Sequence, residues 1–226
     1  MTAQTAKIVT QLRAAANPVN VEGMARFGIN PHNTLGVSVR LLRGLGKQIG
    51  KDHALAQELW DTAIHEARIL ATLVDLPECV DEAQMERWVA GLDSWDVCDQ
   101  VCMNLFRWTP FARQKAVEWA RRDEEFVKRA GFVLMAVLTG SDKKAPDRDF
   151  AQYLPLIIEA ATDERNFVKK AVNWALRQIG KRSPALRRRA IRCARQIQKL
   201  DSKSARWIAR DALRELESEA VQRRLT

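Results

Sequence analysis

The spacing of the apolar residues is the feature that most constrains this sequence. Apolar side chains recur every three or four residues along nearly the whole chain, and the alternation typical of half-buried strands is missing. Proline and glycine separate these segments, as in Asn17-Pro18, Asn30-Pro31 and Leu76-Pro77. The pattern predicts an all-α protein. The predicted helices span residues 3–15, 18–27, 37–49, 52–61, 64–75, 81–91, 94–107, 111–121, 124–139, 147–161, 164–180, 184–199 and 202–216, followed by a short tail.

Similar segments recur at intervals of about 40 residues. Phe126-Val-Lys-Arg-Ala130 resembles Phe167-Val-Lys-Lys-Ala171, which lies 41 residues further along. Ala175-Leu-Arg-Gln178 resembles Ala212-Leu-Arg-Glu215, 37 residues further along. Periods of this length, built from helix pairs, are typical of HEAT or armadillo solenoids, which present a concave face. Because loops are short except at 140–147 and no linker interrupts the pattern, we expect one domain over residues 1–226.

The balance of charge indicates a polyanionic partner. The 226 residues include 37 Lys and Arg against 28 Asp and Glu, a net charge of +9. An apolar fraction of 46% and a charged fraction of 29% are typical of a globular chain rather than a disordered one. Basic proteins without such a partner exist, so the charge alone leaves that alternative open.

Membrane, metal and disulfide chemistry have no support in the sequence. The longest clean apolar run, Phe132 to Leu138, is too short to span a bilayer, and the N-terminus has no signal pattern. We therefore expect an intracellular, cytoplasmic protein. The four cysteines form no CxxC pair and the three histidines have no metal-ligand spacing, so we expect no metal, cofactor or disulfide framework.

The stretch from Asp93 to Trp108 carries the main candidate for chemistry. In a helix at 94–107, Trp95 and Asp99 lie one turn apart, beside each other at the margin of the buried face. That core face is formed by Val97, Cys98, Val101 and Leu105. A carboxylate beside an indole suggests a functional site. The alternative is a large residue at the edge of the core and a satisfied surface acid.

Eight basic residues without an intervening acid form a second candidate site, predicted to bind phosphates. These residues are Arg177, Lys181, Arg182, Arg187, Arg188, Arg189, Arg192 and Arg195. A solvated helix face normally mixes both signs of charge. The alternative is a soluble face balanced by acids that lie elsewhere in space.

Trp174 precedes this run on the helix at 164–180. It lies outside the core arc and beside Lys170 and Arg177, where an indole can stack on nucleic acid or contact a sugar ring. Covering the edge of the core is the alternative. Lys128 and Arg129 could add phosphate contacts or be solvated. The other tryptophans (60, 88, 108, 119 and 207) fit apolar helix faces, so we assign them to packing.

From about Met24 to its C-terminus the chain resembles the AlkD-like DNA alkylation repair family of HEAT-like DNA glycosylases. The resemblance is carried by the order and spacing of several segments. These are Leu59-Trp60, Ile64-His-Glu-Ala-Arg-Ile-Leu-Ala71, Trp95-x3-Asp99, Phe126-Val-Lys-Arg-Ala130, Phe167-Val-Lys-Lys-Ala-Val-Asn-Trp174 and Arg177. The first 20 residues or so match poorly.

The resemblance implies a catalytic cleft on the concave face, formed by Trp95, Asp99 and Trp174. It implies that Arg129 and Arg177 lie near the DNA backbone. It also implies excision of cationic 3-alkyladenine and 7-alkylguanine from double-stranded DNA without base flipping. Because such a base leaves as a neutral molecule, one carboxylate that stabilises the sugar cation and directs a water would suffice.

We therefore expect a monomeric, monofunctional alkylpurine DNA glycosylase. The predicted DNA-binding residues are Lys128, Arg129, Lys170, Arg177, Lys181, Arg182, Arg187 and Arg188. Two alternatives remain at this point. A non-catalytic HEAT protein for damaged or branched DNA shares the basic run but does not need Asp99, and a protein-binding scaffold needs neither.

Overall fold

The computed structural model describes residues 1–225, and within them no strand is present. The chain divides into two compact units, residues 1–109 and residues 110–226. The first contains α1 (Ala3–Ala14), α2 (Pro18–Arg26), α3 (Val39–Ile49), α4 (His53–Asp61), α5 (His65–Val74), η1 (Pro77–Cys79), α6 (Glu82–Ala90), α7 (Trp95–Asn104) and η2 (Phe106–Trp108). The second contains α8 (Ala112–Ala120), α9 (Glu125–Ser141), α10 (Arg148–Ala151), α11 (Leu154–Ala160), α12 (Asn166–Gly180), α13 (Pro184–Ile197), α14 (Lys203–Leu216) and α15 (Glu219–Leu225).

The predicted all-α class is confirmed, and one predicted helix is divided. The segment 147–161 forms two short helices, α10 and α11, instead of one. Pro155 lies in the first turn of α11, where a missing backbone N–H leaves no hydrogen bond unmade. In the middle of a continuous helix the same proline would remove a hydrogen bond and clash with the preceding turn. The chain therefore ends one helix and begins another.

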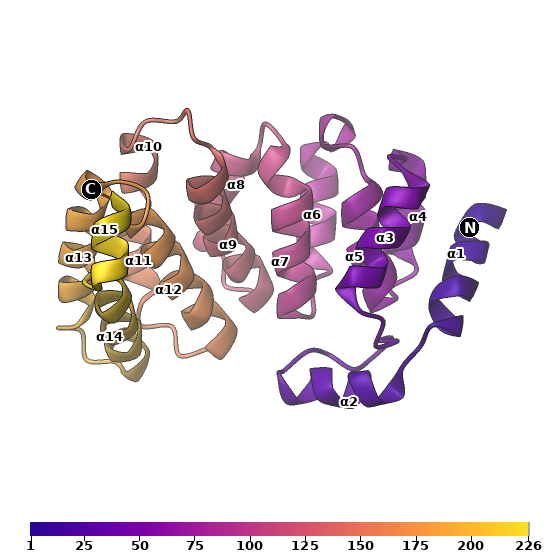
Figure 1. Cartoon of the computed structure of the whole chain (residues 1–226), viewed down its shortest axis with the longest axis horizontal. Helices are drawn as coiled ribbons and strands as arrows, with labels where there is room; N and C mark the ends of the chain where they lie inside the picture. Colours follow the sequence, from indigo (N-terminus) through magenta and orange to yellow (C-terminus); the bar gives the residue numbers. More distant parts are fainter. Residues whose placement is uncertain (226) are drawn as a thin grey trace. The chain divides into compact units, whose positions relative to one another are not determined.

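The first unit is built around α5. Every residue of α5 except Leu73 is buried, because α3, α4 and α7 all pack against it. Trp60 and Trp88 lie face to face beside it, with ring centroids 4.0 Å apart. Figure 1 shows α2 lying crosswise to α3, α5 and α7. This helix has no buried residue, so it does not belong to the core of the unit.

The second unit is built around α9, which packs against both α8 and α12. The run from Ala130 to Thr139 is entirely buried, as expected for a helix that is covered on several sides. Gly131 permits the close approach of α8, because a Cβ atom there would lie 2.4 Å from the backbone nitrogen of Ala120. Within residues 1–225, none of the helices combines the length and apolar composition that a membrane span needs.

Candidate functional site

α7 turns Trp95 and Asp99 away from the core. Its buried face is formed by Val97, Cys98 and Val101, with Leu105 just beyond the helix, as the sequence predicts. Trp95 and Asp99, one turn apart, are partly exposed on another side of the helix. The prediction that this indole and this carboxylate share one side of the helix is confirmed.

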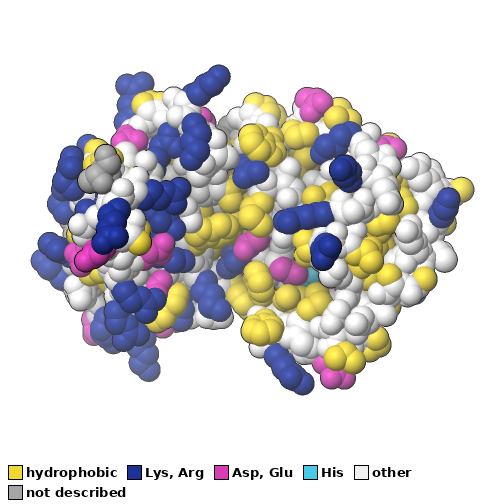
Figure 2. Space-filling view, viewed as in Figure 1, with side chains coloured by type: hydrophobic (Ala, Val, Ile, Leu, Met, Phe, Trp, Pro, Cys, Tyr) yellow, Lys and Arg dark blue, Asp and Glu magenta, His cyan; other side chains and the backbone are white. Residues whose placement is uncertain are grey.

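Trp95 and Asp99 line a groove of about 630 Å³ within the first unit. Its opposite wall comes from α2 and the following loop, including Met24, Phe27 and Val37. In Figure 2, carboxylates lie among hydrophobic side chains over α7. The groove therefore presents acidic oxygen and an indole in largely apolar surroundings, where electrostatic interactions are stronger than in bulk water.

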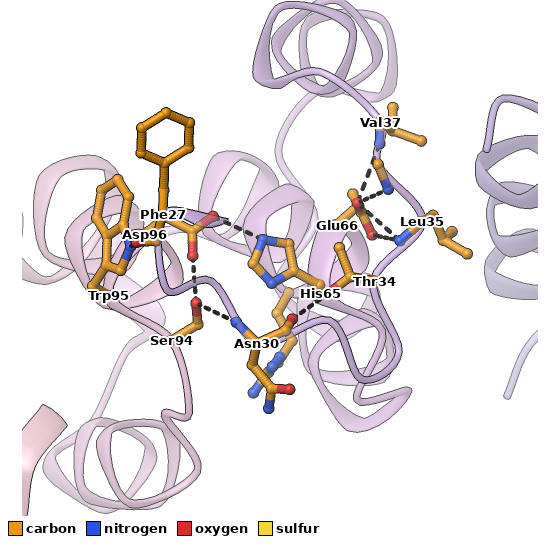
Figure 3. A network of polar contacts seen from close by, with 12 residues as sticks. Phe27, Asn30, Thr34, Leu35, Val37, His65, Glu66, Ser94, Trp95 and Asp96 are labelled. Carbon is orange, nitrogen blue, oxygen red and sulfur yellow. Dashed lines mark hydrogen bonds and ion pairs between the residues drawn. The ribbon is translucent and has the colours of Figure 1, made fainter. Parts of the chain in front are cut away.

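The exposed Phe27 follows directly on α2 and is tied to Trp95. The indole Nε1 of Trp95 donates to the carbonyl oxygen of Phe27 across 3.1 Å, while the phenyl ring is 75% exposed. Figure 3 shows this ring beside the indole, pointing away from the protein interior. The hydrogen bond fixes the orientation of the indole, and the ring leaves an aromatic surface at the mouth of the groove.

A polar network below the groove joins α5, α7 and the loop at 27–38 (Figure 3). The buried His65 donates from Nε2 to Asp96 across 2.8 Å, and the hydroxyl of Ser94 donates to the other oxygen of Asp96. The same hydroxyl accepts from the backbone N–H of Asn30 at 3.4 Å. The backbone N–H of His65 donates to the carbonyl oxygen of Asn33. These contacts hold the N-terminus of α7 against the loop that forms the other wall.

Glu66 anchors the next part of the same loop (Figure 3). Its fully buried carboxylate accepts hydrogen bonds from the backbone amides of Leu35, Gly36 and Val37, at distances between 2.7 and 3.2 Å. Gly36 has φ +78°, a conformation that favours glycine. The turn therefore brings three consecutive N–H groups to one carboxylate.

Sequence reasoning assigned no role to His65 and Glu66, although both belong to the segment from Ile64 to Ala71. A signal was available. A histidine and a glutamate that begin a largely apolar helix are costly to bury, so they must be satisfied by other buried polar groups. What the sequence did not reveal is where these groups come from. The partners of Glu66 are backbone amides of a loop about 30 residues earlier in the chain, and the side-chain partner of His65 is Asp96, 31 residues later.

The pH dependence of stability should report on Asp96. Burial raises the pKa of its carboxyl, but the hydrogen bond and charge of His65, the Ser94 hydroxyl and the Val97 amide outweigh burial and lower the pKa below 3.8. The ionised group therefore stabilises the fold at neutral pH, and this contribution is lost as the pH falls through the lowered pKa. We expect Asp96→Asn to lower the melting temperature at pH 7. The difference from the wild type should narrow below about pH 4, the unfolded pKa of Asp, in circular dichroism melts, and a constant difference would contradict this assignment.

Trp174 lies on α12 in the second unit, where it is partly exposed. The predicted core of that helix is confirmed, since Val168, Ala171, Val172, Ala175 and Ile179 are fully buried. Lys170, one turn before Trp174, is exposed. The joining of Trp174 with Trp95 and Asp99 in one cleft stays a prediction.

Acids distant in the sequence pair with much of the basic run. Arg177 pairs with Glu215 and, at 3.7 Å, with Asp211, and Lys181 binds Glu215 at 2.7 Å. Both acids lie on α14, on the side that faces α12. The alternative of a face balanced by acids elsewhere in space therefore holds for these two cations.

Three further cations of the run are also bound to other segments, and one of them, Arg182, lies 3.6 Å from Asp147. Arg182 donates to the carbonyl oxygens of Thr139 and Ala145, and Arg187 donates to that of Leu216 at 2.6 Å. Arg195 pairs with Glu217 at 3.0 Å. The exposed remainder of the run is Arg188, Arg189 and Arg192 on α13, for which no ion pair is present within residues 1–225. Figure 2 shows many basic side chains over the helices of this unit.

Lys128 and Arg129, the two predicted phosphate contacts on α9, are little exposed and have partners of their own. Lys128 lies 3.7 Å from Asp163, and both side chains are mostly buried. Arg129 is buried and donates to the carbonyl oxygen of Phe167 across 2.6 Å, which joins α9 to the start of α12. A phosphate contact by Arg129 stays a prediction, and the side chain would have to become more accessible to make it.

Two tryptophans assigned to packing are not in the core. Trp60, Trp88 and Trp119 are buried as predicted, whereas Trp108 is 55% exposed and Trp207 is partly exposed on α14. Trp108 lies under the guanidinium of Arg107, 4.4 Å from its ring centroid, and Trp207 is close to Lys169. An indole at the edge of an apolar helix face stays exposed to solvent when no neighbouring element packs against it.

Comparisons with known proteins agree with this description. A profile of the DNA alkylation repair enzyme family matches residues 8–216. A solved structure, described as a new family related to the HEAT-like repeat DNA glycosylases with affinity for branched DNA structures, has 20% identity and a TM-score of 0.81. The alignment covers 98% of this chain and 95% of that one, which confirms the HEAT-like fold. No curated protein matches the sequence. The chain therefore belongs to the DNA alkylation repair enzyme family.

Proposed function

We propose that this protein is a monofunctional DNA glycosylase that removes cationic N3- and N7-alkylated purines from duplex DNA. The observation that carries the proposal is the placement of Asp99 and Trp95 on one side of α7, within one open groove. Membership of a DNA alkylation repair family supports it. The protein acts as a monomer in the compartment that contains the DNA.

Asp99 supplies the chemistry. An alkylated purine carries a positive charge, so the C1′–N bond breaks with its electron pair going to a base that leaves neutral. The sugar becomes an oxocarbenium-like cation, which an ionised Asp99 stabilises as it forms. A water held by the carboxylate forms the new C1′–O bond and gives up its proton to that carboxylate or to solvent. The free base and an abasic site are the products.

The indoles act on the sugar. Trp95 presents an electron-rich face at the groove, and Trp174 on α12 is its proposed counterpart. Such faces attract a cation more strongly than a neutral ring, so they favour the transition state over the bound substrate. Because the lesion itself is charged and weakens the duplex around it, base flipping is not needed in this scheme, and bulky adducts are tolerated. Lys170 and the exposed arginines of α13 hold the phosphates.

A non-catalytic DNA-binding protein is the second candidate. It is favoured by the solved structure of similar fold, which is described as having affinity for branched DNA. The exposed arginines of α13 fit either candidate, because both require phosphate contacts. Asp99 has a role only in the first.

Incubation with methylated duplex DNA separates the two candidates. We expect the protein to release 7-methylguanine and 3-methyladenine, detected by chromatography, and to leave abasic sites in strands that remain intact until treated with alkali. The control is the same DNA without protein, since these bases are also lost spontaneously. Salt-sensitive DNA binding without base release would support the non-catalytic candidate instead.

A further inference from the structure

A second groove, of about 440 Å³, lies in the second unit between the segment entering α12 and the start of α14. One wall is the indole of Trp207, and four basic side chains surround it. They are Lys169, Lys203, Arg206 and Arg210. The proposed reaction uses none of these residues.

The side of α14 that lines the groove is exposed to solvent, while the opposite side of the helix is buried. Lys203, Arg206, Trp207 and Arg210 follow a helical spacing of three, four and seven residues, so they share one side of the helix. Ala205, Ile208, Ala209 and Ala212 on the other side are fully buried. Lys169, from α12, places its Nζ 5.2 Å from the centroid of the Trp207 ring. The indole thus lies between cations contributed by two helices.

The cations of this groove are less neutralised than Arg177 and Lys181 of the basic run. Arg206 pairs with Asp201 at 3.1 Å, but both side chains are exposed, and such pairs contribute little. Within residues 1–225, no ion pair joins Lys203 or Arg210 to an acid. The groove also contains Glu164, whose Oε1 atom is already engaged. It accepts from the Ser202 hydroxyl at 2.7 Å and the Ser204 amide at 3.2 Å.

Ser204 leaves one polar atom of the groove lining without a partner. The side chain lines the groove and is 1% exposed, yet within residues 1–225 its hydroxyl has no hydrogen-bond partner. A buried hydroxyl without a partner costs free energy, so a polar group that enters the groove can lower the free energy by accepting from it or donating to it.

We propose that this groove binds a segment of single-stranded DNA, with one base stacked on Trp207 and the adjoining phosphates held by the surrounding cations. An indole accepts any base, and cations one turn before and after it can reach the phosphates on both sides. A base within an intact duplex has its faces covered by its neighbours and cannot reach the indole. The inference therefore goes beyond excision from duplex DNA, and it adds a contact to strands that are locally unpaired.

Fluorescence anisotropy with a labelled oligothymidylate tests the proposal on the full chain. We expect Trp207→Ala to weaken binding about tenfold, because stacking on one aromatic side chain has an effect of this order. Trp207→Phe keeps an aromatic face and should bind within about threefold of the wild type. The double variant Lys203→Gln/Arg210→Gln should show a shallower dependence of affinity on salt, since it loses two phosphate contacts.

Trp108→Ala is the matched control, because Trp108 is also an exposed indole beside an arginine but lacks the surrounding cluster of cations. It should retain wild-type affinity for the oligothymidylate. The Asp99→Asn variant should also retain it, so the result does not depend on whether Asp99 is catalytic. Wild-type affinity in Trp207→Ala, or an equal loss in Trp108→Ala, would overturn the proposal. Tighter binding of oligouridylate than of oligothymidylate would overturn the assignment to DNA.

Discussion

Replacing Asp99 by Asn should slow the release of 7-methylguanine from methylated duplex DNA by at least about 100-fold. Asparagine has nearly the same shape as aspartate but carries no negative charge. It therefore cannot offset the positive charge that develops on the sugar, and it is a poor acceptor for the proton of the attacking water. Single-turnover assays with the enzyme in excess measure this step directly, because product release does not contribute to the rate.

Measuring the affinity of the same variant for DNA should show that Asp99 contributes to the chemical step and not to binding. Asp99→Asn should bind duplex DNA at least as tightly as the wild type, since removing an acid reduces repulsion of the phosphates. Asp61→Asn is the matched control, because Asp61 is an exposed acid of the first unit and does not line the groove. Asp61→Asn should release 7-methylguanine at the same rate as the wild type. Unchanged base release in Asp99→Asn would remove Asp99 from the mechanism and leave the groove without its proposed catalytic group.

Replacing Glu66 by Gln should destabilise the first unit by about 2–4 kcal/mol. The carboxylate accepts from three consecutive backbone amides in a fully buried position, and water cannot replace it there. The amide nitrogen of glutamine would instead place a donor against donors. We expect the melting temperature to fall by about 10 °C or more. Hydrogen exchange should accelerate at the amides of residues 35–37, because these lose their acceptor.

Glu58→Gln provides the matched comparison for this change. Glu58 also accepts from three donors, the Thr2 amide and the hydroxyls of Thr2 and Thr5, but it does so at the surface. Water can satisfy those donors when the charge is lost, so its melting temperature should stay near that of the wild type. If Glu66→Gln melted like Glu58→Gln and kept slow exchange at residues 35–37, Glu66 would not be the anchor of the loop.

Loss of the anchor should also affect the groove. The loop held by Glu66 contributes Val37 to the wall opposite Asp99 and connects that wall to α2. A variant that melts lower but stays folded at the assay temperature should therefore excise more slowly. This effect acts through positioning and not through contact with the reacting atoms.

Much of the fold followed from local patterns. The apolar period placed α7 and α12 and correctly separated the buried residues of each from Trp95, Asp99 and Trp174. This succeeded because the side of a helix on which a residue lies depends only on its position along that helix. The same reasoning failed at 147–161, where Pro155 divided the segment, and at Trp108 and Trp207, which are exposed and partly exposed instead of buried.

The sequence by itself determined the helical class, the family, and the pairing of an indole with a carboxylate one turn later. Only the tertiary structure decided which basic side chains remain available to bind phosphates. Arg177 and Lys181 are paired with acids of α14 that lie more than 30 residues away, whereas the arginines of α13 remain exposed. It also decided that Glu66 holds the loop of the groove. Such partners are set by the packing of distant segments, so no local spacing encodes them.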